Sequence, residues 1–318
     1  TDSGALTITG TSSFTTSANN ADITLNNNNA FTGAVALNTT GSTGDARIDN
    51  GTTALILAAS SVGGQLRVRS GNSITDSGTV TVGQAFFATT DANNGVINLD
   101  QLAVDGVVVL ATNGSGNATV VNDAGLTLHA KTQTVGGNLT ATATTGNIED
   151  SGTGLTIAGT SSFTTSTNNA DIILDDTGHA FTGAVTLNTS GSTGNATIDN
   201  GTTALNIAAS SVGGNLTLTS GAAAGITDSG TVTVGGNLAA TTDANNGLIN
   251  LGTLAVDGTV ALTTNGSGNA TAVNDAGLTF AASTVGGNLV ATSTTGNMSD
   301  SGALTITGTS SFTTSANN

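Results

Sequence analysis

The chain repeats itself at a long and constant interval. The segment TSSFTTS occurs three times in 318 residues, and its phenylalanines stand 149 residues apart, at Phe14, Phe163 and Phe312. Such self-similarity is typical of repeat architectures. It divides one continuous segment, 1–318, into the units 6–154 and 155–303, with a third unit beginning at 304. We expect this segment to be a window of a longer repeat array.

Each unit contains shorter repeats that open on an apolar residue about every 25 residues. Near the end of the first unit, the stretches LTLHA, GNLTATA and GNIED alternate apolar and polar residues, the pattern of β-strands. VGG, TTG and DSG separate such stretches, and glycine with positive φ and Asp, Asn or Ser side chains are typical of turns. The pattern predicts an all-β parallel β-helix with three short strands per turn, about 25 residues per turn and about 12–13 turns.

The composition supports stacked strands and excludes several partners. Proline, which cannot donate to a central ladder, is absent, as are Cys, Trp and Tyr. Because 20 acidic residues outnumber four Lys and Arg, the net charge is −16, which disfavours nucleic acid. The apolar run VVVLA is far shorter than the roughly 20 residues of a membrane helix, so we expect no membrane insertion.

Several stretches resemble a known family of bacterial exoproteins. SVGGNLTLTSG (211–221), ITDSGTVTVGGNLAATT (226–242) and STVGGNLVATSTTG (283–296) are similar to repeats of filamentous haemagglutinin-like large exoproteins. The resemblance implies a right-handed parallel β-helical shaft, export by two-partner secretion, and a role in adhesion or biofilm at the bacterial cell surface. The secretion domain of that family has no counterpart in this sequence.

Aspartates recur at equivalent positions of the two units, and these are candidate Ca²⁺ ligands. TDANNG has a faint likeness to a calcium loop but lacks the later acidic ligand. We therefore favour turn-capping roles and predict no metal or other cofactor. The pairs are Asp22 and Asp171, Asp49 and Asp199, Asp76 and Asp228, Asp91 and Asp243, Asp105 and Asp257, and Asp123 and Asp275.

Catalysis is not expected, because the groups it would need are not repeated. All cations lie in the first unit, at Arg47, Arg67, Arg69 and Lys131. The second unit has Thr197, Thr217 and Thr219 at the places of the three arginines, and Lys131 falls in a stretch that is shorter there. His129 aligns with Ala281, and His179 replaces part of an Asn run. We name no catalytic, cofactor-binding or metal-binding residue, and we expect Arg67 and Arg69 to project outward from one strand.

The sequence thus predicts a non-enzymatic extracellular fibre or adhesin shaft of a bacterial surface or biofilm matrix. Its expected partners are neighbouring copies, or the continuation of the array along the axis, and host-cell or matrix glycans. The alternative is a solenoid that binds ice or polysaccharide through outward threonines, as in LTIT and TVTV. The apolar residues predicted to form the core include Leu6, Ile8, Phe14, Ile23, Leu25, Phe163 and Phe312.

Overall fold

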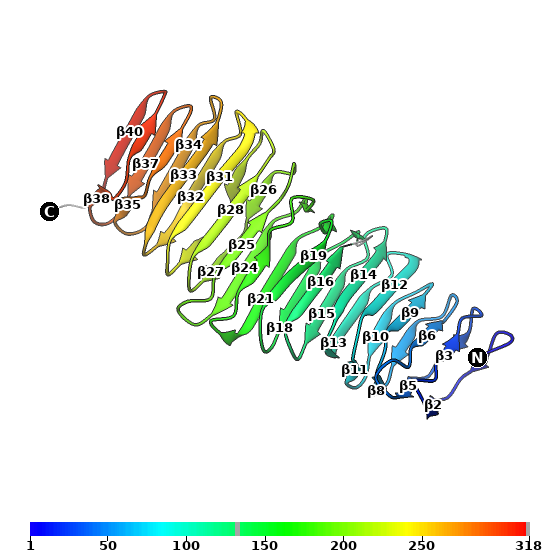
Figure 1. Ribbon diagram of the computed structural model, residues 1–318. Helices are drawn as coiled ribbons and strands as arrows, with labels where there is room; N and C mark the ends of the chain where they lie inside the picture. The colour runs from blue at the N-terminus through cyan, green and yellow to red at the C-terminus, as the bar shows by residue number, and fades with distance from the viewer. Residues whose placement is uncertain (131–133, 316–318) are drawn as a thin grey trace. The chain divides into compact units, whose positions relative to one another are not determined.

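A computed structural model describes residues 1–130 and 134–315, and these contain strands and no helix. The chain divides into two compact units, Thr1–Gly159 and Thr160–Asn318. Their bounds differ by a few residues from those of the sequence repeats, and they are called the first and the second unit from here on. Within each unit the strands lie side by side, as β9, β12, β14 and β16 do in the first and β28, β31, β33 and β35 do in the second (Figure 1). Among the described residues, no helix is long and apolar enough to cross a membrane.

The first unit contains β1 (Thr7–Ile8), β2 (Ser12–Asn19), β3 (Ile23–Leu25), β4 (Ala30–Phe31), β5 (Val35–Thr40), β6 (Ala46–Asp49), β7 (Leu55–Leu57), β8 (Ser60–Val62), β9 (Leu66–Ser70), β10 (Ile74–Asp76), β11 (Val80–Val82), β12 (Phe86–Asn93), β13 (Ile97–Val104), β14 (Val107–Asn113), β15 (Ala118–Asn122), β16 (Leu126–Ala130), β17 (Thr134–Val135), β18 (Leu139–Ala143), β19 (Ile148–Gly152) and β20 (Thr156–Ile157).

The second unit contains β21 (Ser161–Asn168), β22 (Ile172–Leu174), β23 (Ala180–Phe181), β24 (Val185–Ser190), β25 (Ala196–Asp199), β26 (Leu205–Ile207), β27 (Ser210–Val212), β28 (Leu216–Ser220), β29 (Ile226–Asp228), β30 (Val232–Val234), β31 (Leu238–Asn245), β32 (Ile249–Val256), β33 (Thr259–Asn265), β34 (Ala270–Asn274), β35 (Leu278–Phe280), β36 (Ser283–Val285), β37 (Leu289–Ser293), β38 (Met298–Asp300), β39 (Leu304–Ile306) and β40 (Ser310–Thr314).

Three short strands make one turn, and each pairs in parallel with its counterpart in the next turn. In the first unit, β10, β11 and β12 form one such turn. The long strand β13 covers both β10 and β11, pairing Ile97 with Ile74 and Leu102 with Val80, and its register shifts between these two pairs. β14 then covers β12. The expected parallel β-solenoid with three strands per turn is therefore confirmed.

The turns are shorter than the spacing of apolar residues suggested. The described part of the chain forms about 14 turns of about 22 residues, where we expected about 12–13 turns of about 25. The apolar residues that open successive repeats in the sequence do not all stand at the same place in a turn. Leu55 and Val80 open two successive repeats, but Leu55 pairs with Ile74 and not with Val80. The handedness of the winding stays a prediction.

The core follows the strand alternation, with apolar side chains inward. Phe163 is fully buried and packs edge to face on Phe181, with ring centroids 5.7 Å apart. Of the residues predicted to form the core, Ile23 and Leu25 are also buried.

Four of the core predictions were wrong, and all four concern the first or last turn of the described chain. Leu6, Ile8 and Phe14 are only half-buried, and Phe312 is 49% exposed. The reason is that a turn inside the stack is covered from both sides, whereas these outermost turns are covered by a neighbouring turn on one side only. The sequence around Phe312 is the same as around Phe163, so the difference in burial comes from stacking alone.

Glycines in the VGG motifs serve close stacking and not positive φ. Gly63 and Gly213, each the first glycine of such a motif, do not have positive φ. A Cβ atom on Gly63 would collide with the carbonyl oxygen of Gly41 one turn away, and one on Gly213 would collide with that of Gly191. Positive φ is supplied elsewhere, by glycines such as Gly146 and by asparagines such as Asn94.

Candidate functional site

The paired aspartates predicted as turn caps fall into several groups. Asp49 makes a local turn by accepting a hydrogen bond from Gly51 N–H at 2.9 Å, and Asp199 does the same with Gly201 N–H at 2.8 Å. Asp22 and Asp171 instead accept backbone N–H groups one turn away. The carboxylate of Asp76 likewise accepts the N–H groups of Asp100 and Gln101, and Asp228 accepts those of Gly252 and Thr253. These carboxylates therefore bind one turn to the next.

Burial raises the pKa of Asp76 above its ordinary value. The backbone hydrogen bonds to Asp76 oppose that shift, and the nearby charge of Asp100 adds to it. The carboxyl group is half-buried at the end of β10. Asp76 therefore titrates in a setting that penalises its charged form.

The remaining aspartates make other contacts. The carboxylate of Asp91 binds the guanidinium of Arg69. At the equivalent position of the second unit, the backbone carbonyl of Asp243 accepts a hydrogen bond from the side chain of Asn265. Asp123 and Asp275 accept threonine hydroxyls on their backbone carbonyls, and Asp105 and Asp257 donate backbone N–H groups to the preceding turn. In residues 1–130 and 134–315, no three His, Cys, Asp or Glu side chains gather as a metal site would require.

Buried asparagines bind neighbouring turns together, a feature that the sequence patterns above did not predict. Asn50 is fully buried, and its side chain accepts a hydrogen bond from Phe31 N–H at 2.8 Å and donates to Phe31 C=O at 3.0 Å. Asn200 makes the same two bonds with Phe181, and Asn122 and Asn274 make theirs with Val104 and Val256. The available signal was the recurrence of DNGTTAL and VNDAGLT in both units.

The outward face formed by β6, β9, β12, β14 and β16 carries the three described arginines. Arg47 on β6 lies in register with Arg67 on β9, and Arg67 lies in register with Phe87 on β12. Arg69 follows Arg67 by two residues on the same strand, and all three arginines are exposed. The expectation that Arg67 and Arg69 project outward from one strand is confirmed. Lys131 lies outside the described residues.

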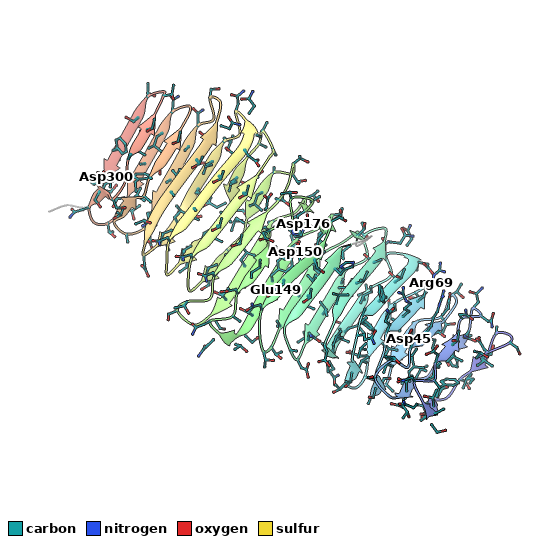
Figure 2. The ribbon with its side chains drawn as sticks, in the orientation of Figure 1. Asp45, Arg69, Glu149, Asp150, Asp176 and Asp300 are labelled. Atoms are coloured by element: carbon teal, nitrogen blue, oxygen red, sulfur yellow. The ribbon has the colours of Figure 1, made fainter. Side chains whose placement is uncertain are left out.

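Arg67 and Arg69 are held in different ways. The guanidinium carbon of Arg67 lies 3.8 Å from the centroid of the Phe87 ring, while Arg67 Nη2 donates to Gln65 Oε1 at 3.0 Å. Arg69 (Figure 2) donates through Nε to Asp91 Oδ2 at 2.6 Å, and its Nη1 lies 3.8 Å from Asp49 Oδ2. The hydrogen bond that Arg69 donates to Asp91, and the negative charge of that carboxylate, raise the pKa of Arg69 above its usual value. Across the described residues, Arg69 makes both of the carboxylate ion pairs found, so Arg47 and Arg67 keep their charges available.

A surface pocket lies between these strands. We call it the arginine–phenylalanine pocket; its lining includes Arg47, Arg67, Phe87, Val107, Val109 and His129. His129 Nδ1 lies 3.0 Å from Ser151 Oγ. The other histidine, His179, is buried in the second unit beside the ring of Phe181.

The corresponding face of the second unit has uncharged residues at the positions equivalent to Arg47 and Arg67. Thr197, Thr217 and Ala239 lie in register there, as Arg47, Arg67 and Phe87 do in the first unit. Beside them runs a column of outward threonines on five successive turns. Its members pair in sequence as Thr219, Thr241, Thr263, Thr284 and Thr305.

Comparison with known proteins places the chain in a family of repeats. No curated protein and no solved structure matches it. Residues 1–38, 43–111, 115–188, 193–247 and 267–318 match the family described as repeats of unknown function (DUF5649). These segments cover most of both units, in agreement with the repeated stacking seen in each. The chain therefore belongs to the DUF5649 family of repeats.

Proposed function

We propose that this β-solenoid repeat protein acts as a non-enzymatic shaft, in a fibre or adhesin on the outside of a bacterial cell or in a biofilm matrix. The observation that supports this most is that both units use the same stabilising contacts from turn to turn. The buried Asn50 and Asn200 bind the turn before them identically, and Ser60 and Ser210 each accept a backbone N–H from the preceding turn at 3.0 Å. Such a stack supplies length and stiffness from nearest-neighbour contacts alone.

The surface chemistry supports a shaft that does not aggregate with its neighbours. A net charge of −16 makes separate copies repel one another at low salt. The resemblance to filamentous haemagglutinin-like exoproteins favours an extracellular location. As partners we propose further solenoid turns along the same axis, from neighbouring copies or a longer array, together with glycans at the surface that the shaft reaches.

The test is antibody labelling of intact, unpermeabilised cells of the organism that produces the chain. Gold label on thin fibres outside the envelope, removed by treating whole cells with protease, is the expected result. Label that appears only after permeabilisation would contradict the extracellular shaft. A matched antibody against a cytosolic protein controls for leakage.

A second candidate function is binding of ice or of a crystalline polysaccharide by the threonine column of the second unit. The observation in its favour is the regular register of Thr219 through Thr305, which repeats hydroxyls at the strand spacing of about 4.8 Å. Inhibition of ice recrystallisation and co-sedimentation with insoluble glucan are the assays. Thr241→Lys with Thr263→Lys is expected to abolish such binding, whereas Asn250→Lys, on the exposed face of β32 and outside any threonine motif, is expected to leave it unchanged.

A further inference from the structure

The distribution of positive charge in this chain is not what a uniform shaft requires. The chain has four Lys and Arg in total, and three of them stand on the neighbouring strands β6 and β9. Arg47 and Arg67 are direct register partners, and like charges opposite one another destabilise a sheet. The second unit builds the same strands with Thr197 and Thr217, so the fold does not need these arginines.

We propose that the arginine–phenylalanine pocket binds a carboxylated polysaccharide, a polymer of uronic acid residues. Arg47 and Arg67 stand on neighbouring strands, which lie about 4.8 Å apart along the stack. Their guanidinium groups can bind carboxylates through paired N–H groups. Arg67 is held in place by the Phe87 ring and by Gln65, so less of its side-chain freedom is lost on binding. The inference does not depend on the shaft role.

The surroundings of the arginines also suit a sugar polymer. Beside the two cations, the pocket offers apolar surface from the half-buried Val107 and Phe87, against which the C–H face of a sugar ring can pack. Asp22 and Asp45 line the neighbouring depression, which Arg47 and Arg67 also line. Their carboxylates can accept hydrogen bonds from sugar hydroxyls, which a uronic acid polymer carries on every ring and polyphosphate does not.

Nucleic acid fits the pocket less well. Binding of single strands relies on bases that stack on aromatic faces, and one face of Phe87 is already covered by Arg67. The chain has no Trp or Tyr to provide another large aromatic platform.

The experiment measures binding of polygalacturonate to the full chain by isothermal titration calorimetry at low salt. The unmodified chain is expected to bind it and not to bind the fully methyl-esterified polymer, which lacks the charges. Arg47→Thr with Arg67→Thr installs the residues of the second unit and is expected to weaken binding at least about tenfold. The control, Thr197→Glu with Thr217→Glu, changes the net charge equally on the matching face of the second unit and is expected to weaken it far less.

A gain-of-function variant keeps the inference testable independently of any loss of stability. Thr197→Arg, Thr217→Arg and Ala239→Phe, made in the Arg47→Thr, Arg67→Thr background, are expected to restore binding. No binding by the unmodified chain, or equal weakening by the arginine variant and its charge control, would overturn the site. Tighter binding of polyphosphate or single-stranded DNA than of polygalacturonate would overturn the assignment to a polysaccharide. None of these results bears on whether the chain forms fibres, so the two proposals fail separately.

Discussion

The buried side chain of Asn50 binds both backbone groups of Phe31, accepting from its N–H at 2.8 Å and donating to its C=O at 3.0 Å. Phe31 stands 19 residues earlier, so the amide replaces a backbone ladder between successive turns at a corner. The same amide also donates to Ala54 C=O at 2.8 Å, which closes its own corner. One side chain thus fixes the corner and attaches it to the turn before.

Asn50→Ala is expected to lower the free energy of unfolding by about 2–4 kcal/mol, because it leaves a buried N–H and buried carbonyls without partners. Urea denaturation followed by circular dichroism provides the measurement. Asn98→Ala, on the exposed face of β13, is the matched control and should change stability by less than about 0.5 kcal/mol. Equal effects of the two substitutions would contradict the role of Asn50.

Gly213→Ala is expected to destabilise the second unit by about 1–3 kcal/mol, because the new methyl group meets the backbone carbonyl of Gly191. The control is Gly252→Ala, since a Cβ there has only the Asp228 carboxylate nearby, at 3.8 Å. Thermal unfolding of both variants makes the comparison. If Gly252→Ala proves the more harmful, turn stacking is not the reason for the VGG motif.

Phe163→Ala is expected to cost about 3–5 kcal/mol, the usual effect of removing a fully buried aromatic ring. Phe312→Ala, in the same local sequence, should cost less than about 1 kcal/mol because that ring is 49% exposed. Denaturant titration of the two variants separates the contribution of stacking from that of sequence. Similar losses would show that the two rings are equally buried in solution.

Asp76 should give stability a recognisable pH dependence. Burial raises its native pKa above the unfolded value of 3.8, so the native state binds its proton more tightly. The stabilisation from that proton is complete below the unfolded pKa and is lost as the pH rises through the raised native pKa. Asp76→Asn removes this loss, so the stability of the variant relative to the parent should be greater at about pH 7 than at about pH 3. Urea midpoints of both proteins provide the comparison, and a relative stability that is constant or falls with pH would contradict the shift.

Arg69→Thr, which installs the residue of the second unit at position 219, should lower stability by less than about 1 kcal/mol, because the ion pair with Asp91 is exposed to solvent. The loss should shrink as salt is added. Chemical denaturation at low and high salt tests this. A large loss that does not depend on salt would mean that Arg69 stabilises the face by packing and not by charge.

Strand alternation and repetition were enough to predict the fold class. The alternation in LTLHA, GNLTATA and GNIED corresponds to β16, β18 and β19, and the parity of Arg67 and Arg69 places both outward. These features depend only on the period of two in a strand, which needs no knowledge of the neighbouring turn.

The relation between neighbouring turns could not be predicted, because corner lengths vary. The register offset is 20 residues from Arg47 to Arg67 but 24 from Ile172 to Ala196. A constant spacing of about 25 residues therefore does not place Arg47 opposite Arg67, and it does not bring Asn50 to Phe31. The pocket and the hydrogen bonds of the buried asparagines both arise from contacts between turns. For that reason neither could be predicted from the sequence pattern.

The most direct test of the shaft is electron microscopy of the native, unproteolysed material, with the subunit mass determined on the same sample. The account predicts thin unbranched fibres that carry epitopes of this chain along their length, whether the fibre is one giant repeat chain or many copies end to end. A subunit mass far above 30.4 kDa would indicate the first arrangement, and a mass near 30.4 kDa the second. Discrete particles of about 30.4 kDa, with no fibre, would contradict the proposed function.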